Sequence, residues 1–299
     1  MKKLLFIYNP TSGKGRVADG LATILNTFAR TGWLTTVYPT QCKGDAARAA
    51  REFGPHFDRV VCAGGDGTLS ETVTGLMSLS APPLLGYIPF GSTNDCAVNL
   101  NLPKVPTQAA LIAAQDGVPR ESDIGKLNGS PFVYVAAFGA FTQVAYGTSQ
   151  DLKNTFGHLA YVMEGIASLP TITPYHIKVE YDGNVIEGDF LYGMVSNTTS
   201  VGGVKNFPPG NPDLSDGLLE VTLISPIRGI KTVEEFGRAV LSGDPSVLSS
   251  VLTSFSTPKV TITSEEGLTW TLDGEPGGTH RVAEIEALHN AYTIVHGYG

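Results

Sequence analysis

Hydrophobic and polar positions follow two different patterns along this chain. In the first part, short apolar runs typical of buried strands alternate with apolar residues spaced three and four positions apart, as on one face of a helix. The runs predict strands over residues 4–8, 34–38, 60–63 and 84–88, and the spaced positions predict helices over 17–28, 46–53 and 107–116. This strand–helix alternation predicts a mainly parallel sheet covered by helices.

After residue 122 the pattern favours strands. Residues 132–141 are apolar and rich in strand-forming residues, and residues 177–181 alternate up to a turn signal at Asp182-Gly183, which predicts a hairpin. We also predict strands over 218–224, 259–263 and 268–272, the last two joined through 265–267, and a helical insertion within 232–252. Such a run of strands predicts an antiparallel sandwich. The predicted fold class is therefore α/β, with an N-terminal α/β domain over 1–122 and a C-terminal β-sandwich domain over 123–283.

Composition narrows the functional classes. The chain has 20 basic and 28 acidic residues and a net charge of −8, which argues against nucleic acid as a partner. Its three cysteines show no paired spacing, which suits a reducing compartment. No apolar run approaches the roughly 20 residues that a membrane-spanning helix needs. We expect a cytoplasmic protein, which would act on any lipid from the membrane surface.

One glycine-rich segment is especially informative about function. Gly64-Gly65-Asp66-Gly67-Thr68-Leu69-Ser70-Glu71 joins a predicted strand to a predicted helix. Glycines allow the backbone to approach a ligand closely, and the start of a helix presents free N–H groups and the positive end of its dipole. This arrangement is typical of a phosphate site. Because an aspartate beside a phosphate needs a cation between them, Asp66 indicates Mg²⁺.

Two similar segments follow the first and fourth predicted strands. Asn9-Pro10-Thr11-Ser12-Gly13-Lys14-Gly15 supplies amides, hydroxyls and a lysine, without the spacing of a Walker A loop. Pro89-Phe90-Gly91-Ser92-Thr93-Asn94-Asp95 supplies more polar groups, although a capped helix start also explains it. Ligands of open α/β sheets bind beyond the carboxyl ends of the strands, so we expect these loops to share one site.

Three other acidic positions are candidates for chemistry. Asp123 lies at the predicted domain junction, where it either faces a cleft or is a solvated loop acid. Asp273-Gly274-Glu275 offers two carboxylates around a glycine, as a general base with an electrostatic partner or as an exposed turn. The segment 213–218 could fold into a turn that binds a hard cation. The six histidines show no metal-ligand spacing.

Taken together, these motifs resemble the diacylglycerol/sphingosine kinase catalytic family, and within it the soluble bacterial lipid kinases. The resemblance runs from Asn9 to Glu275 and rests on the three glycine-rich segments and on Asp273-Gly274-Glu275. Two positions depart from the common third motif of the family. Ser92 replaces a threonine and keeps its hydroxyl, and Cys96 replaces a phenylalanine.

The resemblance implies a Rossmann-like, NAD kinase/phosphofructokinase-like α/β domain that binds ATP, to which residues 284–299 return, and a β-sandwich that accepts the lipid. It implies that Asp66 organises the catalytic Mg²⁺ with help from Asp123 through water. Glu275 would be the general base, with Asp273 as a rival. The residues implied in a structural Mg²⁺ site are Asp213, Asp216 and Leu218, the first and last through their carbonyls. The residues implied in ATP binding are Asn9, Pro10, Thr11, Ser12, Gly13, Lys14, Thr40, Gly64, Gly65, Asp66, Gly67, Thr68, Leu69, Ser70, Glu71, Ser92, Asn94 and Asp95.

We therefore predict an ATP- and Mg²⁺-dependent lipid kinase that phosphorylates a lipid hydroxyl, with diacylglycerol as the first candidate acceptor and phosphatidic acid as its product. A kinase for NAD or another small molecule stays open, because it shares the Asp66 segment. A non-catalytic lipid- or nucleotide-binding regulator is the alternative from another class. The expected partner is a lipid at a membrane surface, with homodimerisation left open.

Overall fold

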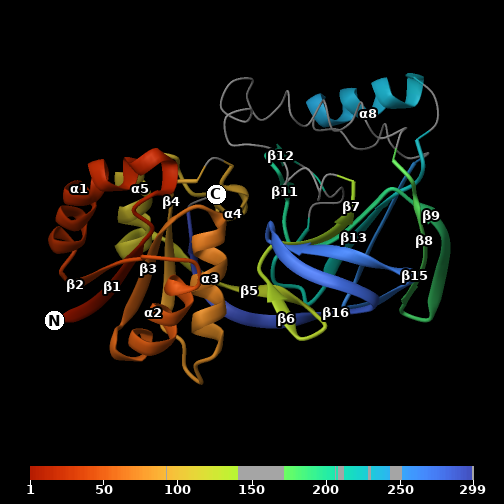
Figure 1. Cartoon of the computed structure of the whole chain (residues 1–299). Coiled ribbons are helices and arrows are strands. Elements are labelled where there is room, and N and C mark those ends of the chain that lie inside the picture. Colours follow the sequence, from red (N-terminus) through yellow and green to blue (C-terminus); the bar gives the residue numbers. More distant parts are fainter. Residues whose placement is uncertain are drawn as a thin grey trace. The chain divides into compact units, whose positions relative to one another are not determined.

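The computed structural model describes residues 1–91, 93–140, 172–205, 207, 212–227, 230–242 and 251–297. The chain divides into two compact units (Figure 1). Unit 1 comprises Met1–Asp123 and His289–Gly299, and unit 2 comprises Ile124–Leu288. The chain leaves unit 1 within strand β5 (Val118–Leu127) and returns to it within strand β16 (Glu275–His296).

Unit 1 is built on a parallel sheet with the strand order β16-β4-β3-β1-β2. Its first four strands in chain order are β1 (Lys2–Tyr8), β2 (Trp33–Pro39), β3 (Arg59–Gly64) and β4 (Leu84–Pro89). The end of β16 adds a fifth strand, since Ile294 pairs with Leu85 of β4. Apolar side chains dominate the inner strands because both faces of the sheet are covered.

Helices pack on this sheet in two pairs, α1 with α5 and α2 with α3 (Figure 1). The helical segments are η1 (Ser12–Gly15), α1 (Arg16–Arg30), α2 (Asp45–Phe53), η2 (Gly54–His56), α3 (Asp66–Met77), α4 (Asp95–Asn99), α5 (Pro106–Leu111) and the π-helix η3 (Ile112–Asp116). Val17, Ile24 and Phe28 of α1 pack with Phe6 and Val61 of the sheet in one buried cluster. The spacing of the α1 positions is the one from which the sequence predicted this helix.

Unit 2 is largely antiparallel, with the strand order β14-β13-β10-β7-β15-β16 and with β8 pairing both β15 and β9. The strands not yet given are β6 (Ser130–Phe132), β7 (Val135–Gly139), β8 (Tyr175–Tyr181), β9 (Asn184–Phe190), β10 (Tyr192–Ser196), β11 (Ser200–Val201), β12 (Val204–Lys205), β13 (Leu219–Ile224), β14 (Leu252–Thr257) and β15 (Lys259–Leu272). Helix α8 spans Ile230–Ser242. Phe138 and Trp270 meet edge to face in the core, with 4.9 Å between their ring centroids.

The predicted fold class is confirmed, and so is the hairpin of β8 and β9. One prediction in unit 2 is wrong in detail. The strands predicted over 259–263 and 268–272 are one strand, β15, which keeps pairing with β16 through a shift of register and a glycine, Gly267, at φ +82°. The helical insertion predicted within 232–252 is present as α8, Ile230–Ser242, while residues 243–250 lie outside the described residues.

The predicted apolar segment 132–141 also divides differently. It contains the end of β6 and the whole of β7, and Phe141 lies outside the described residues. The helix predicted over 107–116 changes from α to π at Ile112. Among the described residues, no helix is both long and apolar enough to cross a bilayer.

Candidate active site

Four loops of unit 1 lie along one edge of its sheet. Strands β4, β3, β1 and β2 are neighbours and parallel, so their carboxyl ends share this edge, where α/β proteins bind ligands. Three backbone hydrogen bonds tie the loop starts to neighbouring strands: Asn9 N–H to the Ala63 carbonyl (3.0 Å), Thr40 N–H to the Tyr8 carbonyl (2.9 Å) and Phe90 N–H to the Gly64 carbonyl (2.7 Å). The predicted glycine-rich segments are therefore brought together.

Glycine is required where these loops touch. A Cβ atom on Gly91 would lie 2.8 Å from Cα of Gly65, and one on Gly13 would lie 2.6 Å from the carbonyl oxygen of Phe90. Both distances are too short for any side chain. The loops after β1, β3 and β4 therefore pack directly against one another through their backbones.

Asp66 begins helix α3 and reaches the start of helix α4. Its carboxylate accepts the N–H groups of Asp95 (3.2 Å) and Cys96 (3.1 Å). Burial, and then the charge of Asp95, raise the pKa of Asp66 to about 6. Two carboxylates that repel each other in a largely buried place are stabilised by a cation. The residues present therefore fit a divalent metal ion.

Two predicted nucleotide contacts instead shape their own loops with their side chains. Asn9 Oδ1 accepts the N–H (3.0 Å) and the hydroxyl (2.8 Å) of Thr11. Asn94, at φ +56°, bonds Gly91 twice, with Oδ1 accepting its N–H (2.7 Å) and Nδ2 donating to its carbonyl (2.8 Å). These side chains therefore fix the backbone conformation of the loops after β1 and β4.

Other residues of the predicted ATP site lie in the same loops. Thr68 and Leu69 are buried, with 7% and 1% of their surface exposed. Ser92 lies outside the described residues. The remaining predicted contacts of these loops are Pro10, Ser12, Gly13, Lys14, Gly64, Gly65, Gly67 and Ser70.

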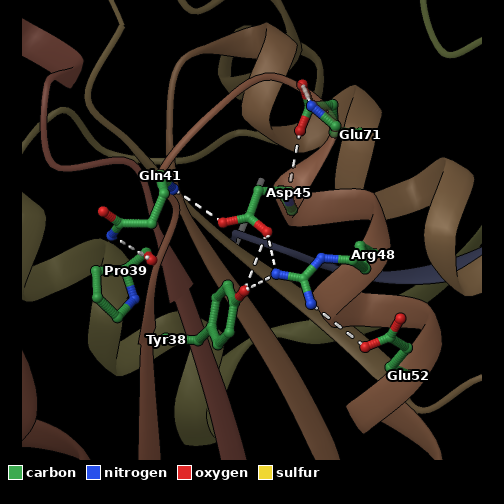
Figure 2. Close-up of polar contacts among 9 residues, drawn as sticks. Tyr38, Pro39, Gln41, Asp45, Arg48, Glu52 and Glu71 are labelled. Carbon is green, nitrogen blue, oxygen red and sulfur yellow. Dashed lines mark hydrogen bonds and ion pairs between the residues drawn. The ribbon is translucent and has the colours of Figure 1, made fainter.

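Glu71 meets the loop that carries Thr40. Its Oε1 accepts the N–H of Gly44 (2.8 Å) and its Oε2 accepts that of Ala46 (3.3 Å) (Figure 2). Asp45, next to Gly44, is 4% exposed and is bonded by three other groups. Asp45 was not among the predicted site residues, although an acidic residue in the first turn of a helix is a recognised signal.

Asp123 is buried, which excludes the solvated loop acid. Its Oδ1 accepts the backbone N–H of Asn290 (2.6 Å) and lies 3.0 Å from Nδ1 of His289. His289 was not among the predicted site residues. The two residues are separated by more than 160 positions, so no local pattern signals their contact.

The two acids of the predicted base motif have different surroundings in unit 2. Asp273 and Gly274, at φ +50° and +83°, form the two-residue turn between β15 and β16, in which Leu272 pairs with Glu275. Asp273 is 9% exposed, and its carboxylate accepts three backbone N–H groups, from Val133 (2.7 Å), Tyr134 (3.0 Å) and Val135 (3.1 Å). Glu275 is exposed.

The segment 213–218 is folded by its own acids. Asp213 Oδ1 accepts the N–H and the hydroxyl of Ser215 (3.1 Å each), and Asp216 Oδ1 accepts the N–H of Leu218 (2.9 Å). Burial, assisted by the charges of Asp216 and Asp213, raises the pKa of nearby Glu220 to about 8. In the described part of the chain, no group of three or more histidine, cysteine or acidic residues could hold a metal. The predicted structural Mg²⁺ site, which draws on carbonyls, stays a prediction.

This chain is similar to known proteins along nearly its whole length. Residues 3–127 match the model of the diacylglycerol kinase catalytic domain, and residues 135–295 match that of the YegS C-terminal NAD kinase beta sandwich-like domain. A diacylglycerol kinase of Bacillus subtilis is 35% identical over 279 residues, 93% of this chain and 91% of the relative. A diacylglycerol kinase of Staphylococcus carnosus is 33% identical over 283 residues, 93% and 90% of the two chains. A crystal structure of a diacylglycerol kinase from Bacillus anthracis is similar with a TM-score of 0.83 at 25% identity, covering 99% of this chain and 97% of that one.

Proposed function

The chain belongs to the diacylglycerol kinase catalytic family, and on this premise we propose that it is an ATP- and Mg²⁺-dependent lipid kinase. It transfers the γ-phosphoryl group of ATP to the hydroxyl of diacylglycerol and forms phosphatidic acid. One observation carries the proposal within unit 1. The edge of its parallel sheet gathers the glycine-rich loops around Asp66 at the start of α3.

The loops after β1, β3 and β4 bind the phosphates of ATP through their backbone. Gly67 supports this role, because it lies in the first turn of α3 and is exposed, and beyond its chain neighbours and the backbone of its own helix no protein atom lies within 4 Å of the place where a Cβ would stand. The first-turn N–H groups of a helix have no partner within the helix and favour an anion. Positioning of this kind supplies most of the catalysis in phosphoryl transfer.

Asp66, with Asp123 through water, would hold the catalytic Mg²⁺. When bound, the ion offsets the charge that develops on the transferring phosphoryl group. The raised pKa of Asp66 supports this assignment, since its carboxylate is destabilised without a cation. The N–H groups of Asp95 and Cys96 fix the orientation of that carboxylate.

Glu275 accepts the proton of the lipid hydroxyl. Its rival Asp273 already receives three backbone N–H groups, which occupy most of the lone-pair positions of its carboxylate. Asp273 therefore holds the turn, and the exposed Glu275 is the better proton acceptor. General base catalysis of this kind contributes about 10²–10⁴-fold to the rate.

The acceptor is a lipid, so we propose that the cytoplasmic enzyme works while bound peripherally to a membrane.

Asp216, together with the carbonyls of Asp213 and Leu218, would hold a second, structural Mg²⁺. The two Asx turns of this segment support a shaped cation site.

A panel of acceptors tests the function. The full-length protein is incubated with γ-labelled ATP, Mg²⁺ and vesicles that contain diacylglycerol, phosphatidylglycerol or a sphingoid base, and in parallel with NAD. Label in phosphatidic acid is expected. Label in another lipid would correct the acceptor, label in NADP would favour the small-molecule kinase, and no transfer to any acceptor would favour the non-catalytic regulator.

A further inference from the structure

The loop of residues 40–44, between β2 and α2, is fixed by hydrogen bonds from its backbone to side chains that lie outside the loop. Residues 41–44 are all exposed. Thr40 begins the loop at the same sheet edge as the glycine-rich segments, with its N–H bonded to β1. An exposed loop with so little burial depends on particular hydrogen bonds for its conformation.

Asp45 holds the first half of this loop. Its Oδ2 accepts the N–H of Gln41 (2.9 Å), and its Oδ1 accepts the hydroxyl of Tyr38 (3.0 Å) and pairs with Arg48 (Figure 2). The hydrogen bond from Gln41, ahead of the contacts with Arg48 and Tyr38, lowers the pKa of Asp45. The carboxylate is therefore a charged, buried anchor at neutral pH.

Glu71 holds the second half of the loop from another helix. Helix α2 begins after Gly44 and has no side-chain cap at its N-cap position. Glu71 of α3 takes this place, because its two oxygens accept the N–H groups of Gly44 and Ala46. A negative charge at the start of a helix is favourable. Glu71 thereby joins the loop to the helix that begins with Asp66.

We propose that Glu71 is a positioning residue. It does not contact ATP itself, but it fixes the loop of residues 40–44, which does. This inference rests on the proposed function, and it changes the role that the sequence suggested, a direct contact of Glu71 with the nucleotide. One carboxylate oxygen binds the backbone of Gly44 in the loop, and the other binds the backbone of Ala46 in the first turn of α2. Loss of Glu71 would free the loop from α3 while leaving Asp66 and the glycine-rich segments in place.

The test compares Glu71→Ala and Glu71→Gln with the wild type in two measurements. The first is hydrogen exchange of the backbone amides of residues 40–46 without nucleotide. The second is the affinity for a non-hydrolysable ATP analogue with Mg²⁺, together with KM for ATP and for lipid. Glu52→Gln is the matched control, since Glu52 is exposed on α2 and bonds only the side chain of Arg48 among its described hydrogen bonds.

Glu71→Ala should speed the exchange of Gly44 and Ala46 and weaken ATP binding about tenfold, the effect of losing one charge-assisted hydrogen bond to the loop. KM for lipid should not change. Glu71→Gln should recover part of the affinity, because its amide oxygen still accepts from Gly44. Faster exchange with unchanged ATP affinity would reduce Glu71 to a structural role, and weaker ATP binding with unchanged exchange would mean direct contact; either result overturns the proposal. A wild type that binds no ATP would instead refute the proposed function.

Discussion

Replacing Asp273 by asparagine tests whether Asp273 stabilises the β15–β16 turn or acts as the general base in place of Glu275. Asparagine tolerates the positive φ of this position and keeps one carbonyl oxygen for Tyr134 and Val135. The buried N–H of Val133 loses its acceptor, and the two surviving hydrogen bonds lose their ionic character. The substitution should lower the free energy of unfolding by about 3 kcal/mol, since a hydrogen bond to a charged group contributes about 1.5–3 kcal/mol. This corresponds to a fall in melting temperature of about 6–12 °C.

Glu275→Gln is the matched variant, with the opposite expectation. Glu275 is exposed, so the melting temperature of the Glu275→Gln variant should stay within about 2 °C of that of the wild type. Its turnover should fall about 10²–10⁴-fold, with ATP affinity retained. Thermal melting and the lipid kinase assay, run well below both melting points, measure the two effects. A stable but inactive Asp273→Asn beside a fully active Glu275→Gln would refute the reasoning and make Asp273 the base.

Three further results are expected. Gly67→Ala should leave the protein as stable as the wild type, since the new Cβ meets no atom outside its own helix turn, and should weaken ATP binding at least about tenfold if phosphate approaches this backbone. Gly91→Ala should lower the melting temperature instead, because its Cβ meets Gly65. Glu220 has a folded pKa of about 8 in the metal-free protein, above its unfolded value, so its contribution to stability is present below pH 4.5 and lost as pH rises through 8; urea unfolding at pH 5 and pH 9, with a chelator present, should show this loss in the wild type and not in Glu220→Gln. His296 is buried, and burial, then the charge of Arg120, lower its pKa to about 4, so stability should fall as pH drops from 6.5 towards 4; a His296→Gln variant with the same slope in that window would contradict this.

The parts of the fold that could be predicted from the sequence are those that depend on neighbouring residues, such as turns and helices with regularly spaced apolar positions. Asp182-Gly183 between alternating strands specified a hairpin, and the apolar spacing from Val17 to Phe28 specified α1. The break predicted between residues 263 and 268 failed for a tertiary reason. Glu265, Glu266 and Gly267 suggest a turn, but continued pairing with β16 absorbs them as an irregularity within β15.

The candidate site divides in the same way. The glycine-rich segments could be placed together from the sequence because parallel strands end at one edge. Contacts between distant positions could not be found, among them Glu71 with Gly44, Asp123 with His289, and the three backbone groups around Asp273. In these contacts a side chain binds backbone or another element, and such pairing leaves no periodic trace in a single sequence.

In the proposed function, Asp66 makes the edge of the unit 1 sheet a site for metal-dependent phosphoryl transfer. The most direct measurement is the rate of label transfer from γ-labelled ATP to diacylglycerol vesicles in Mg²⁺, for the wild type and for Asp66→Asn, whose amide oxygen still accepts a hydrogen bond at α4. Rapid formation of phosphatidic acid by the wild type, and a loss of at least about 100-fold in a variant that melts at the same temperature, is the predicted result. Equal rates for the two proteins, or no transfer by the wild type, would contradict it.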